Sequence, residues 1–172
     1  MFLTGDPTPD ERVLRFLRTR GHTPAREQFA ARFSKLGEHG AVWLAIGAAG
    51  ATLDGARRTG WRRASAAVGS AYVINTALKL VGGRRRPTLP GLPPLTATPT
   101  GLSFPSAHAA TGFAGALAYS RMGLPAPALY GLAGSLALSR LYLGVHYPSD
   151  VIAGALLGST LAWALTGAGR GA

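Results

Sequence analysis

The sequence has no cysteine and few acidic residues. None of its 172 residues is Cys, which excludes disulfides, thiolate metal sites and cysteine nucleophiles. Asp and Glu together number 7 against 18 Lys and Arg, and no acidic residue occurs between Asp54 and Asp150. A metal site built on carboxylates therefore has no ligands in this long middle segment.

Charged residues of both signs are also scarce. They make up 15% of the chain, against about 25% in an average soluble domain, while apolar residues make up 47%. This composition is typical of a membrane protein, and the length indicates a single domain. A soluble helical bundle is the alternative, but the connections at 57–63 and 121–125 carry too few charges to cover solvent-facing surfaces.

The formal charge of +11 raises the question of a nucleic-acid partner. Here the basic residues stand between apolar stretches, where anionic lipid headgroups attract them equally well. We therefore expect membrane lipids and no nucleic acid as partners. The sequence gives no indication of the oligomeric state.

Residues 1–38 are expected to form amphipathic interfacial helices. Residues 8–11 (TPDE) supply an N-cap, a proline at the first helical position and an acid three residues after the cap. Residues 23–24 (TP) repeat the start signal, and Phe29 and Phe33 then follow at helical spacing. A basic amphipathic pair suits the membrane interface, with ordinary helices packed on a soluble core as the alternative.

Residues 39–172 are expected to form a membrane domain of about five transmembrane helices, which makes the fold class all-α. This prediction depends on five apolar segments, at 38–55, 64–83, 106–121, 124–143 and 150–167. Most of them approach the roughly 20 residues that cross the hydrocarbon core, and their many small residues allow close helix packing. The stretch 87–104 contains five prolines. It is expected at or outside the membrane surface, because irregular backbone has no hydrogen-bond partners in lipid.

An up-and-down arrangement of these helices brings four polar clusters to one face of the membrane. The second segment ends near KLVGGRRRP (79–87), the third begins at PSAH (105–108), the fourth ends in SRLYLGVH (139–146) and the fifth begins at YPSD (147–150). Ionisable groups in membrane segments are usually functional. The clusters therefore predict one shared site.

The charges of these clusters indicate an anionic ligand. Lys79, Arg86 and Arg140 supply three cations, and the geometry of arginine suits phosphate oxygens. The helix starts at Ser106 and Ser149 are both expected to aim backbone N–H groups at the same anion.

Two histidines and an aspartate complete the predicted site. His146 and Asp150 are four residues apart across a helix start. The carboxylate is expected to accept a hydrogen bond from one ring N–H, which fixes the tautomer and leaves the other nitrogen to act as a nucleophile. His108 is then available as a separate acid or base. His22 and His39 lack such surroundings and are expected to be interfacial residues.

Each cluster taken singly also has a purely structural explanation. Lys79 would extend to lipid headgroups, residues 84–86 would anchor the topology, and Asp150 would cap a helix. Anchoring explains the cations, but it gives no reason for two histidines and a carboxylate to gather with them. We therefore favour a functional site.

The three motifs resemble those of the type 2 phosphatidic acid phosphatase (PAP2) superfamily, whose pattern is K-x6-RP, PSGH and SR-x5-H-x3-D. Here they read KLVGGRRRP, PSAH and SRLYLGVHYPSD, in the same order and with the same internal spacing. The resemblance in helix order covers residues 38–167. It implies a small bacterial membrane lipid phosphatase that works without a metal.

The resemblance implies a role for each residue of the motifs. His146 would attack phosphorus to form a phosphohistidine, oriented by Asp150, while His108 would protonate the leaving oxygen and then activate water. The phosphoryl oxygens would be held by Lys79, Arg86, Ser106, Arg140 and the backbone of Ala107. No metal and no other cofactor are implied, since the site has several cations and one plausible acid.

The implied substrate is a lipid phosphate or diphosphate whose tail stays in the bilayer. We expect a polyprenyl carrier first, either undecaprenyl diphosphate or a decaprenyl-phosphoryl phosphoribose, and phosphatidylglycerophosphate or phosphatidate next. The alternatives from other classes are a non-catalytic protein that binds anionic lipids, a small transporter, and a vanadate-dependent haloperoxidase. Haloperoxidases share the motifs by resemblance but are soluble and larger.

Two departures from the family pattern affect these expectations. Ala107 stands where the family usually has Gly, so its methyl group is expected to alter the phosphate pocket without removing the N–H. Surface helices stand in place of the first helix of six-span members, which puts the N-terminal segment on the active-site face.

The orientation in the membrane follows from opposing signals. The positive-inside rule applied alone places the site in the cytoplasm. The resemblance to bacterial lipid phosphatases and the arginine-dense loop at 57–63 favour the outer face. We therefore expect a multi-pass protein of the inner (plasma) membrane whose active site faces outward.

Overall fold

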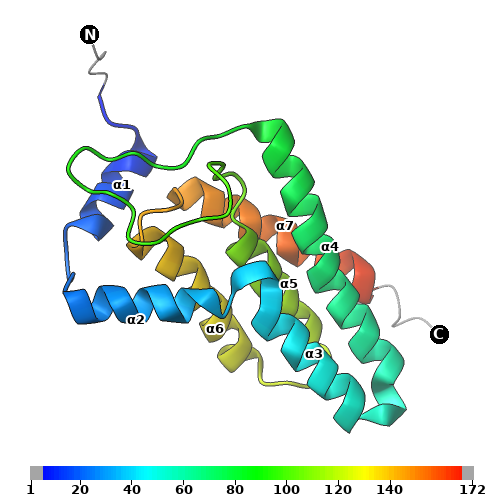
Figure 1. Cartoon of the computed structure of the whole chain (residues 1–172). Coiled ribbons are helices and arrows are strands. Elements are labelled where there is room, and N and C mark those ends of the chain that lie inside the picture. The colour runs from blue at the N-terminus through cyan, green and yellow to red at the C-terminus, as the bar shows by residue number, and fades with distance from the viewer. Residues whose placement is uncertain (1–5, 168–172) are drawn as a thin grey trace.

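The computed structural model describes residues 6–167 and shows an all-α protein (Figure 1). The elements, in chain order, are α1 (Pro9–Arg18), α2 (Pro24–Lys35), the 3-10 turn η1 (Glu38–Gly40), α3 (Ala41–Leu53), the 3-10 turn η2 (Gly55–Arg57), α4 (Arg58–Gly82), α5 (Ala107–Ser120), α6 (Ala126–Tyr142) and α7 (Pro148–Gly167). Each of the five apolar segments of the sequence contains one helix, from α3 to α7. The prediction of an all-α fold is confirmed.

Helix α4 begins earlier than the apolar pattern predicts. The preceding turn is fixed by Asp54, whose Oδ2 accepts hydrogen bonds from Arg57 Nε at 2.6 Å and from Trp61 Nε1 at 3.1 Å. These bonds hold the first turn of α4 against the end of α3. The arginine-rich stretch 58–63 is therefore helical although it lies outside the apolar segment.

The centre of the bundle is α5, whose faces are nearly all buried. It packs against α4, α6 and α7, and most extensively against α7. Small side chains permit this approach, since a Cβ added at Gly154 or Gly158 of α7 would collide with backbone atoms of α5. Larger residues fill the remaining space beside α3, where Tyr119 donates a hydrogen bond to the carbonyl oxygen of Trp43 at 2.7 Å. Both aromatic side chains are fully buried.

The N-terminal helices lie at one end of this bundle, beside the irregular segment 83–106 (Figure 1). Thr8 caps α1 through a reciprocal capping box with Glu11, and Thr23 caps α2. Arg18 ties α1 to the bundle, because its guanidinium donates to the carbonyl oxygens of Pro93 at 2.6 Å and Tyr142 at 3.4 Å. The two predicted helices are present, and they pack on α6 and α7.

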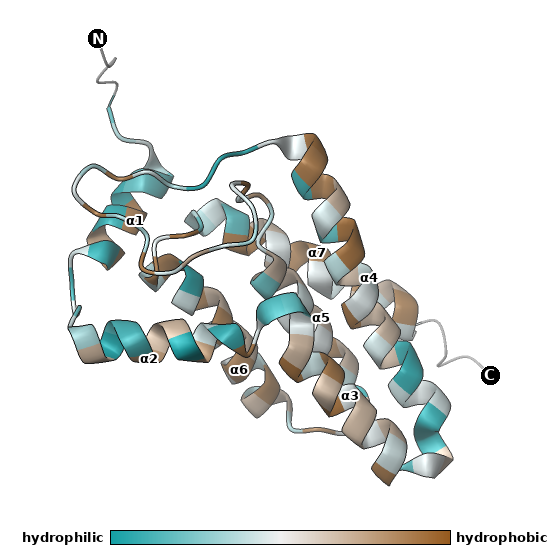
Figure 2. Ribbon diagram, in the orientation of Figure 1, coloured by the Kyte–Doolittle hydropathy of each residue, from teal (hydrophilic) through white to brown (hydrophobic). Residues whose placement is uncertain are grey.

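Apolar side chains cover much of the outside of α4 and α7. Within residues 6–167, two helical segments are long and apolar enough to cross a membrane by length and composition. They are Gly55–Gly82, with a mean hydropathy of 1.2, and Pro148–Gly167, with 1.3. Figure 2 shows hydrophilic residues over α1 and at the start of α4, with mostly apolar or neutral residues between these ends.

Candidate active site

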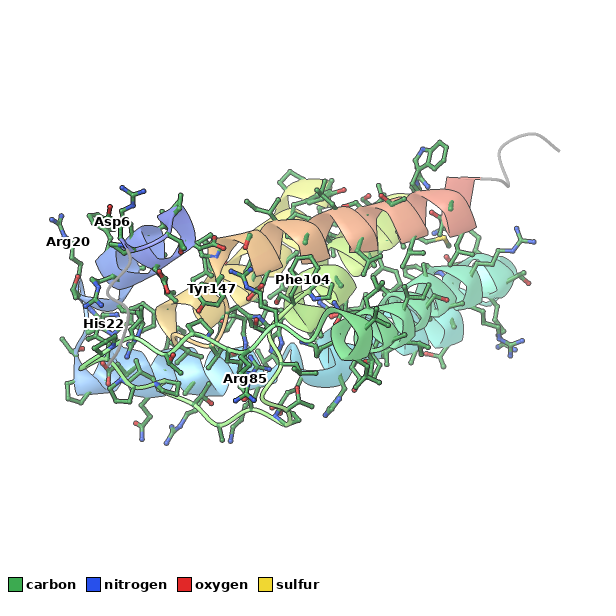
Figure 3. All side chains as sticks on the ribbon, turned by 90° about the horizontal axis from the view of Figure 1, so that it is seen from above. Asp6, Arg20, His22, Arg85, Phe104 and Tyr147 are labelled. Atoms are coloured by element: carbon green, nitrogen blue, oxygen red, sulfur yellow. The ribbon has the colours of Figure 1, made fainter. Side chains whose placement is uncertain are left out.

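A pocket opens at the end of the bundle where α4 and α6 end and α5 begins. Its volume is about 120 Å³. It is lined by Glu38, His39, Tyr72, Thr76, Lys79, Arg86, Pro99, Thr100, Ala107, His108, Arg140 and His146. In Figure 3, Arg85, Phe104 and Tyr147 lie near this end, between the N-terminal helices and the bundle. Residues from all three sequence motifs thus meet in one cavity, as the up-and-down arrangement predicts.

Two of the cations are held in place by backbone carbonyl oxygens. Lys79 Nζ donates to the carbonyls of Leu102 and Ser103, both at 3.4 Å. Arg86 donates through Nε to the carbonyl of Thr100 at 2.8 Å and through Nη1 to that of Val145 at 2.7 Å. Segment 83–106 therefore fixes both positive groups at the pocket wall without neutralising them.

Other donors at this end of the bundle have no partner among the described residues. Arg140 Nε and Ser106 Oγ are buried and form no hydrogen bond with any of the residues 6–167. Ser106 is the N-cap of α5 but forms no side-chain cap. The first N–H groups of α5, including that of Ala107, thus remain available to an anion. Buried donors of this kind are costly unless a ligand accepts their hydrogen bonds.

His146 and Asp150 lie side by side at the start of α7. Nδ1 of His146 is 3.4 Å from Oδ2 of Asp150, while that oxygen accepts the Tyr147 N–H at 2.8 Å. Nε2 of His146 points the other way and is 3.3 Å from Arg86 Nη1. The ring therefore presents Nε2 to the pocket, as a nucleophile requires. Nδ1 forms no hydrogen bond with the described residues, so the bond to Asp150 that the spacing predicts is not made here.

His108 reaches the pocket from the first turn of α5 and is bound to the N-terminal region. Its Nε2 lies 2.9 Å from the carbonyl oxygen of Ser34, which accepts hydrogen bonds and donates none. Nε2 is therefore protonated, and Nδ1 is the nitrogen left for other partners. Ser34 also accepts a hydrogen bond from Arg140 Nη1 at 2.6 Å through its hydroxyl group. The last turn of α2 thus contacts two of the predicted site residues.

A second link joins the N-terminal region to Asp150. Arg84 donates through Nη1 to Asp150 Oδ1 at 2.9 Å and through Nη2 to Asp10 Oδ2 at 2.8 Å. Its guanidinium also lies over the Tyr147 ring, 4.0 Å from the centroid. Burial opposes the ionisation of Asp10, but hydrogen bonds from Arg84 and Ser149 hold the pKa of this carboxyl group below its usual value. Arg84 therefore positions Asp150 and does not line the pocket.

The prediction for the start of α7 is wrong. The Ser149 N–H donates to Asp10 Oδ1 at 3.0 Å, and the Ser149 hydroxyl group donates to Asp10 Oδ2. The protein's own carboxylate occupies this helix N-terminus, where the positive end of the dipole favours it. The N-terminus of α5 is the one that faces the pocket.

The prediction for the surroundings of His39 is wrong. It was expected to lack those of the motif histidines, yet it lines the pocket together with His108 and His146; its place at the membrane interface stays a prediction. The reason is the sharp turn at η1, where His39 has a φ of 51° and Gly40 a φ of 72°. Two successive residues in the left-handed region reverse the chain from α2 into α3, and a local sequence pattern does not show where such a turn points.

Burial lowers the pKa of His146 to about 4, with a further lowering from Arg86 and an opposing effect of Asp150. A histidine in water has a pKa near 6.5. The lowered value keeps the ring neutral, and hence nucleophilic, at any pH well above about 4. Protonation removes the Nε2 lone pair as the pH falls through that value.

We therefore expect His146 to cause no fall in kcat/KM between about pH 7 and about pH 5, once the rate is corrected for the ionisation of the substrate and of the general acid His108. Replacing Arg86 with Gln should move the acid limb to a higher pH, because one of the charges that oppose protonation is removed. Initial rates across the pH range, with the substrate titrated separately by phosphorus NMR, provide the measurement. An acid limb centred near the ordinary histidine value would contradict the assignment of His146.

Several residues outside the motifs contact or line the site, three of them within residues 1–38. Asp10, Ser34 and Glu38 belong to α1, α2 and η1, and sequence reasoning assigned none of them to it. Each stands in an amphipathic segment where an isolated polar residue is ordinary. The one signal available was the position of residues 1–38 on the active-site face of the predicted topology.

Comparison with protein families agrees with this geometry. The sequence model of the PAP2 superfamily matches residues 60–170, which include all three motifs. The chain belongs to the PAP2 superfamily.

Named relatives within this group act as phosphatases. The decaprenylphosphoryl-5-phosphoribose phosphatase of Mycolicibacterium smegmatis is 44% identical over 126 residues, which are 73% of this chain and 69% of the relative. The enzyme of the same name from Mycobacterium tuberculosis is 41% identical over 143 residues, which are 83% of this chain and 80% of the relative. The prediction of a PAP2-type phosphatase is confirmed.

Solved structures share the fold. LpxE of Aquifex aeolicus superposes with a TM-score of 0.76 at 26% identity, covering 94% of this chain and 96% of its own. A transmembrane PAP2-type phosphatidylglycerolphosphate phosphatase from Bacillus subtilis gives a TM-score of 0.73 at 22% identity, covering 92% of this chain and 83% of its own. At that level of identity, the second likeness concerns the fold alone.

Proposed function

We propose that this protein is an integral-membrane phosphatase that removes the phosphate from the pentose of a decaprenylphosphoryl 5-phosphoribose. The observation that carries the proposal is the pocket in which His146, His108 and three cations meet. The mycobacterial relatives, at 44% and 41% identity, take their names from this substrate. The likeness to the B. subtilis phosphatase does not favour phosphatidylglycerophosphate as the substrate of this protein, because that likeness concerns the fold alone.

The reaction proceeds in two steps within this pocket. Nε2 of His146 attacks phosphorus, and the bond from phosphorus to the ester oxygen breaks. His108 takes part in its protonated form: it keeps its Nε2–H on the Ser34 carbonyl and donates its Nδ1 proton to the departing alkoxide. Water then attacks the phosphohistidine while His108 takes up its proton, and inorganic phosphate leaves. Asp150 stabilises the positive ring of His146. Lys79, Arg86, Arg140, Ser106 and the Ala107 N–H bind the oxygens of the five-coordinate transition state.

The proposed arrangement in the membrane has five spans, α3 to α7, with α1 and α2 at the interface. The apolar windows of α4 and α7 support it, since 33% and 22% of their residues are buried inside the protein. Large side chains on these helices face outward, among them Val81 at 87% exposure and Trp163 at 65%. Lipid is the solvent that suits such surfaces.

The pocket is proposed to face the outside of the inner (plasma) membrane. The exposed arginines at 57–63 lie at the start of α4, the end opposite the pocket, where they suit the cytoplasmic surface. The chain has no cysteine, so Thr59→Cys introduces a single thiol at this end. We expect an impermeant thiol reagent to label it in permeabilised cells and not in intact ones. Rapid labelling of intact cells would reverse the orientation.

Phosphate release by the purified protein in detergent tests the function. The panel contains decaprenylphosphoryl 5-phosphoribose, undecaprenyl diphosphate, phosphatidylglycerophosphate and phosphatidate, each with and without a chelator. We expect the pentose lipid to give the highest kcat/KM, by about tenfold or more, and the chelator to have no effect. A higher value for another lipid would replace the proposed substrate, and loss of activity on chelation would end the metal-free mechanism.

A further inference from the structure

The pocket has a second half that the phosphatase chemistry does not use. Lys79, Arg86, Arg140 and the two motif histidines form its cationic half. The remaining polar lining is of a different kind and comes from η1, α4 and segment 83–106: Glu38, His39, Tyr72, Thr76 and Thr100. These side chains carry hydroxyl groups, an imidazole and a carboxylate, which are groups that bind neutral hydroxyls.

One face of α4 connects the two halves. Tyr72, Thr76 and Lys79 follow one another at spacings of four and three residues, so they lie in a row along the helix. With a rise of about 1.5 Å per residue, Tyr72 is roughly 10 Å from Lys79 along the axis. The Thr76 hydroxyl group donates to the carbonyl of Tyr72 at 2.9 Å, which leaves its oxygen as an acceptor. The row extends from Lys79, in the cationic half of the pocket, over a distance comparable to the length of a phosphorylated sugar.

Glu38 is the feature that a phosphate site alone does not explain. Among the described residues that line the pocket it is the one carboxylate. It forms no ion pair with Arg140 or with any other of residues 6–167, and it is half-buried. A negative group here repels a phosphate dianion. A carboxylate is, however, a strong acceptor for sugar hydroxyls, the role that an acidic side chain plays toward the ribose in dinucleotide-binding folds.

The backbone around Glu38 is fixed relative to the catalytic histidine. The neighbouring His39 has a left-handed φ of 51°, a conformation that persists in a non-glycine residue when its surroundings impose it. Its Nδ1 is hydrogen-bonded to the Tyr72 hydroxyl group at 2.7 Å. On the other side, a Cβ added at Gly37 would come within 2.7 Å of His108 Cδ2, so the turn packs directly on that ring. Glu38 thus stands between two anchored points.

We propose that Glu38, Tyr72 and Thr76 form a subsite for the hydroxyl groups of a pentose whose phosphate lies on Lys79, Arg86 and Arg140. Glu38 accepts hydrogen bonds from the vicinal hydroxyls, and Tyr72 and Thr76 contact the ring from α4. The inference rests on the proposed function and adds to it the residues that select the pentose. A lipid phosphate without the sugar gains nothing from this half of the pocket.

The competing explanation for Glu38 is that it offsets the charge of Arg140. The two roles give opposite results for Glu38→Gln. If the carboxylate serves charge balance, its loss strengthens the binding of every phosphate. If it binds the pentose, its loss weakens binding of the substrate that carries one and leaves other phosphates bound equally well or better.

The experiment measures kcat/KM of the wild type, Glu38→Gln and Tyr72→Phe on decaprenylphosphoryl 5-phosphoribose and on decaprenyl phosphate. We expect each variant to lose about tenfold on the pentose lipid and less than twofold on the pentose-free lipid. Glu27→Gln is the matched control, since Glu27 contacts His22 outside the pocket. Inhibition by ribose 5-phosphate relative to inorganic phosphate gives a second readout, and the preference for the sugar phosphate should fall about tenfold in Glu38→Gln.

The outcomes separate this inference from the proposed function. Equal losses on both lipids, or no loss on either, would overturn the subsite while the phosphatase assignment stands. A wild-type protein that hydrolyses neither lipid would overturn the proposed function and the subsite with it. A variant that unfolds, as seen by loss of its thermal transition in detergent, is replaced by Thr76→Val. This variant must then lose kcat/KM on the pentose lipid and keep it on the pentose-free lipid.

Discussion

Replacing His146 with alanine is expected to lower the rate of phosphate release by about 10⁴-fold or more. The substitution removes the atom that we propose attacks phosphorus, and the loss of a covalent nucleophile has effects of this order in enzymes that act through such intermediates. The residual rate would come from the cations and the α5 N-terminus, which still bind and polarise the phosphoryl group. Initial rates of inorganic phosphate release in detergent provide the measurement.

The matched control is His22→Ala. His22 stacks on Tyr142, 4.0 Å between ring centroids, and contacts Glu27, outside the pocket. We expect its rate to stay within about threefold of the wild type. His108→Ala should behave differently from both, because it removes the proton donor of the first step and the base of the second. With an activated substrate whose leaving group needs no proton, the first step should still proceed in this variant, and an acid-labile phosphoenzyme should accumulate. A rate for His146→Ala within tenfold of the wild type would rule out the nucleophile.

The second large effect is expected at Gly158 of α7. A Cβ at this position would overlap the backbone of Ala110 on α5, and backbone cannot move aside as a flexible side chain does. Gly158→Ala should therefore lower the free energy of unfolding by about 2–3 kcal/mol, in the upper range of overpacking effects. Activity should fall by more than the loss of folded protein accounts for, because α5 carries His108 and α7 carries Asp150. Thermal unfolding in detergent, followed by circular dichroism, tests this.

Gly131 on α6 provides the opposite case. An added Cβ there meets no atom within 4 Å. Gly131→Ala should therefore raise the free energy of unfolding by about 0.5–1 kcal/mol, since alanine is the better helix former. The two substitutions are chemically identical, so a difference in sign isolates the contact between α5 and α7. A midpoint for Gly158→Ala at or above that of the wild type would show that the two helices do not pack as described.

The helices of the bundle were predictable because their signals are local. Apolar runs bounded by proline and glycine mark α5, α6 and α7, and the proline-rich segment 83–106 is irregular as its composition requires. The pocket was also predictable in outline. An up-and-down order of helices places alternate ends on one side, so clusters at those ends have to meet.

The part of the site contributed by residues 1–38 was not predictable in this way. Asp10 and Ser34 look like ordinary polar positions on amphipathic helices, yet they contact Arg84 and Arg140 across 74 and 106 residues of sequence. The prediction for the α7 N-terminus was wrong for the same reason. Its anion is Asp10, and no spacing within the motifs shows that a carboxylate 139 residues away along the chain reaches Ser149.

The sequence by itself determined the helical class, the order of the helices and the three motifs with their cations and histidines, because helix formation and motif spacing depend on residues close together in the chain. Tertiary structure alone decided that the end of α2 lies on His108, that Arg84 joins Asp10 to Asp150, and that Glu38 and Tyr72 share the pocket with the cations. Such contacts depend on how whole helices pack, and packing is set by the shapes of many distant side chains together.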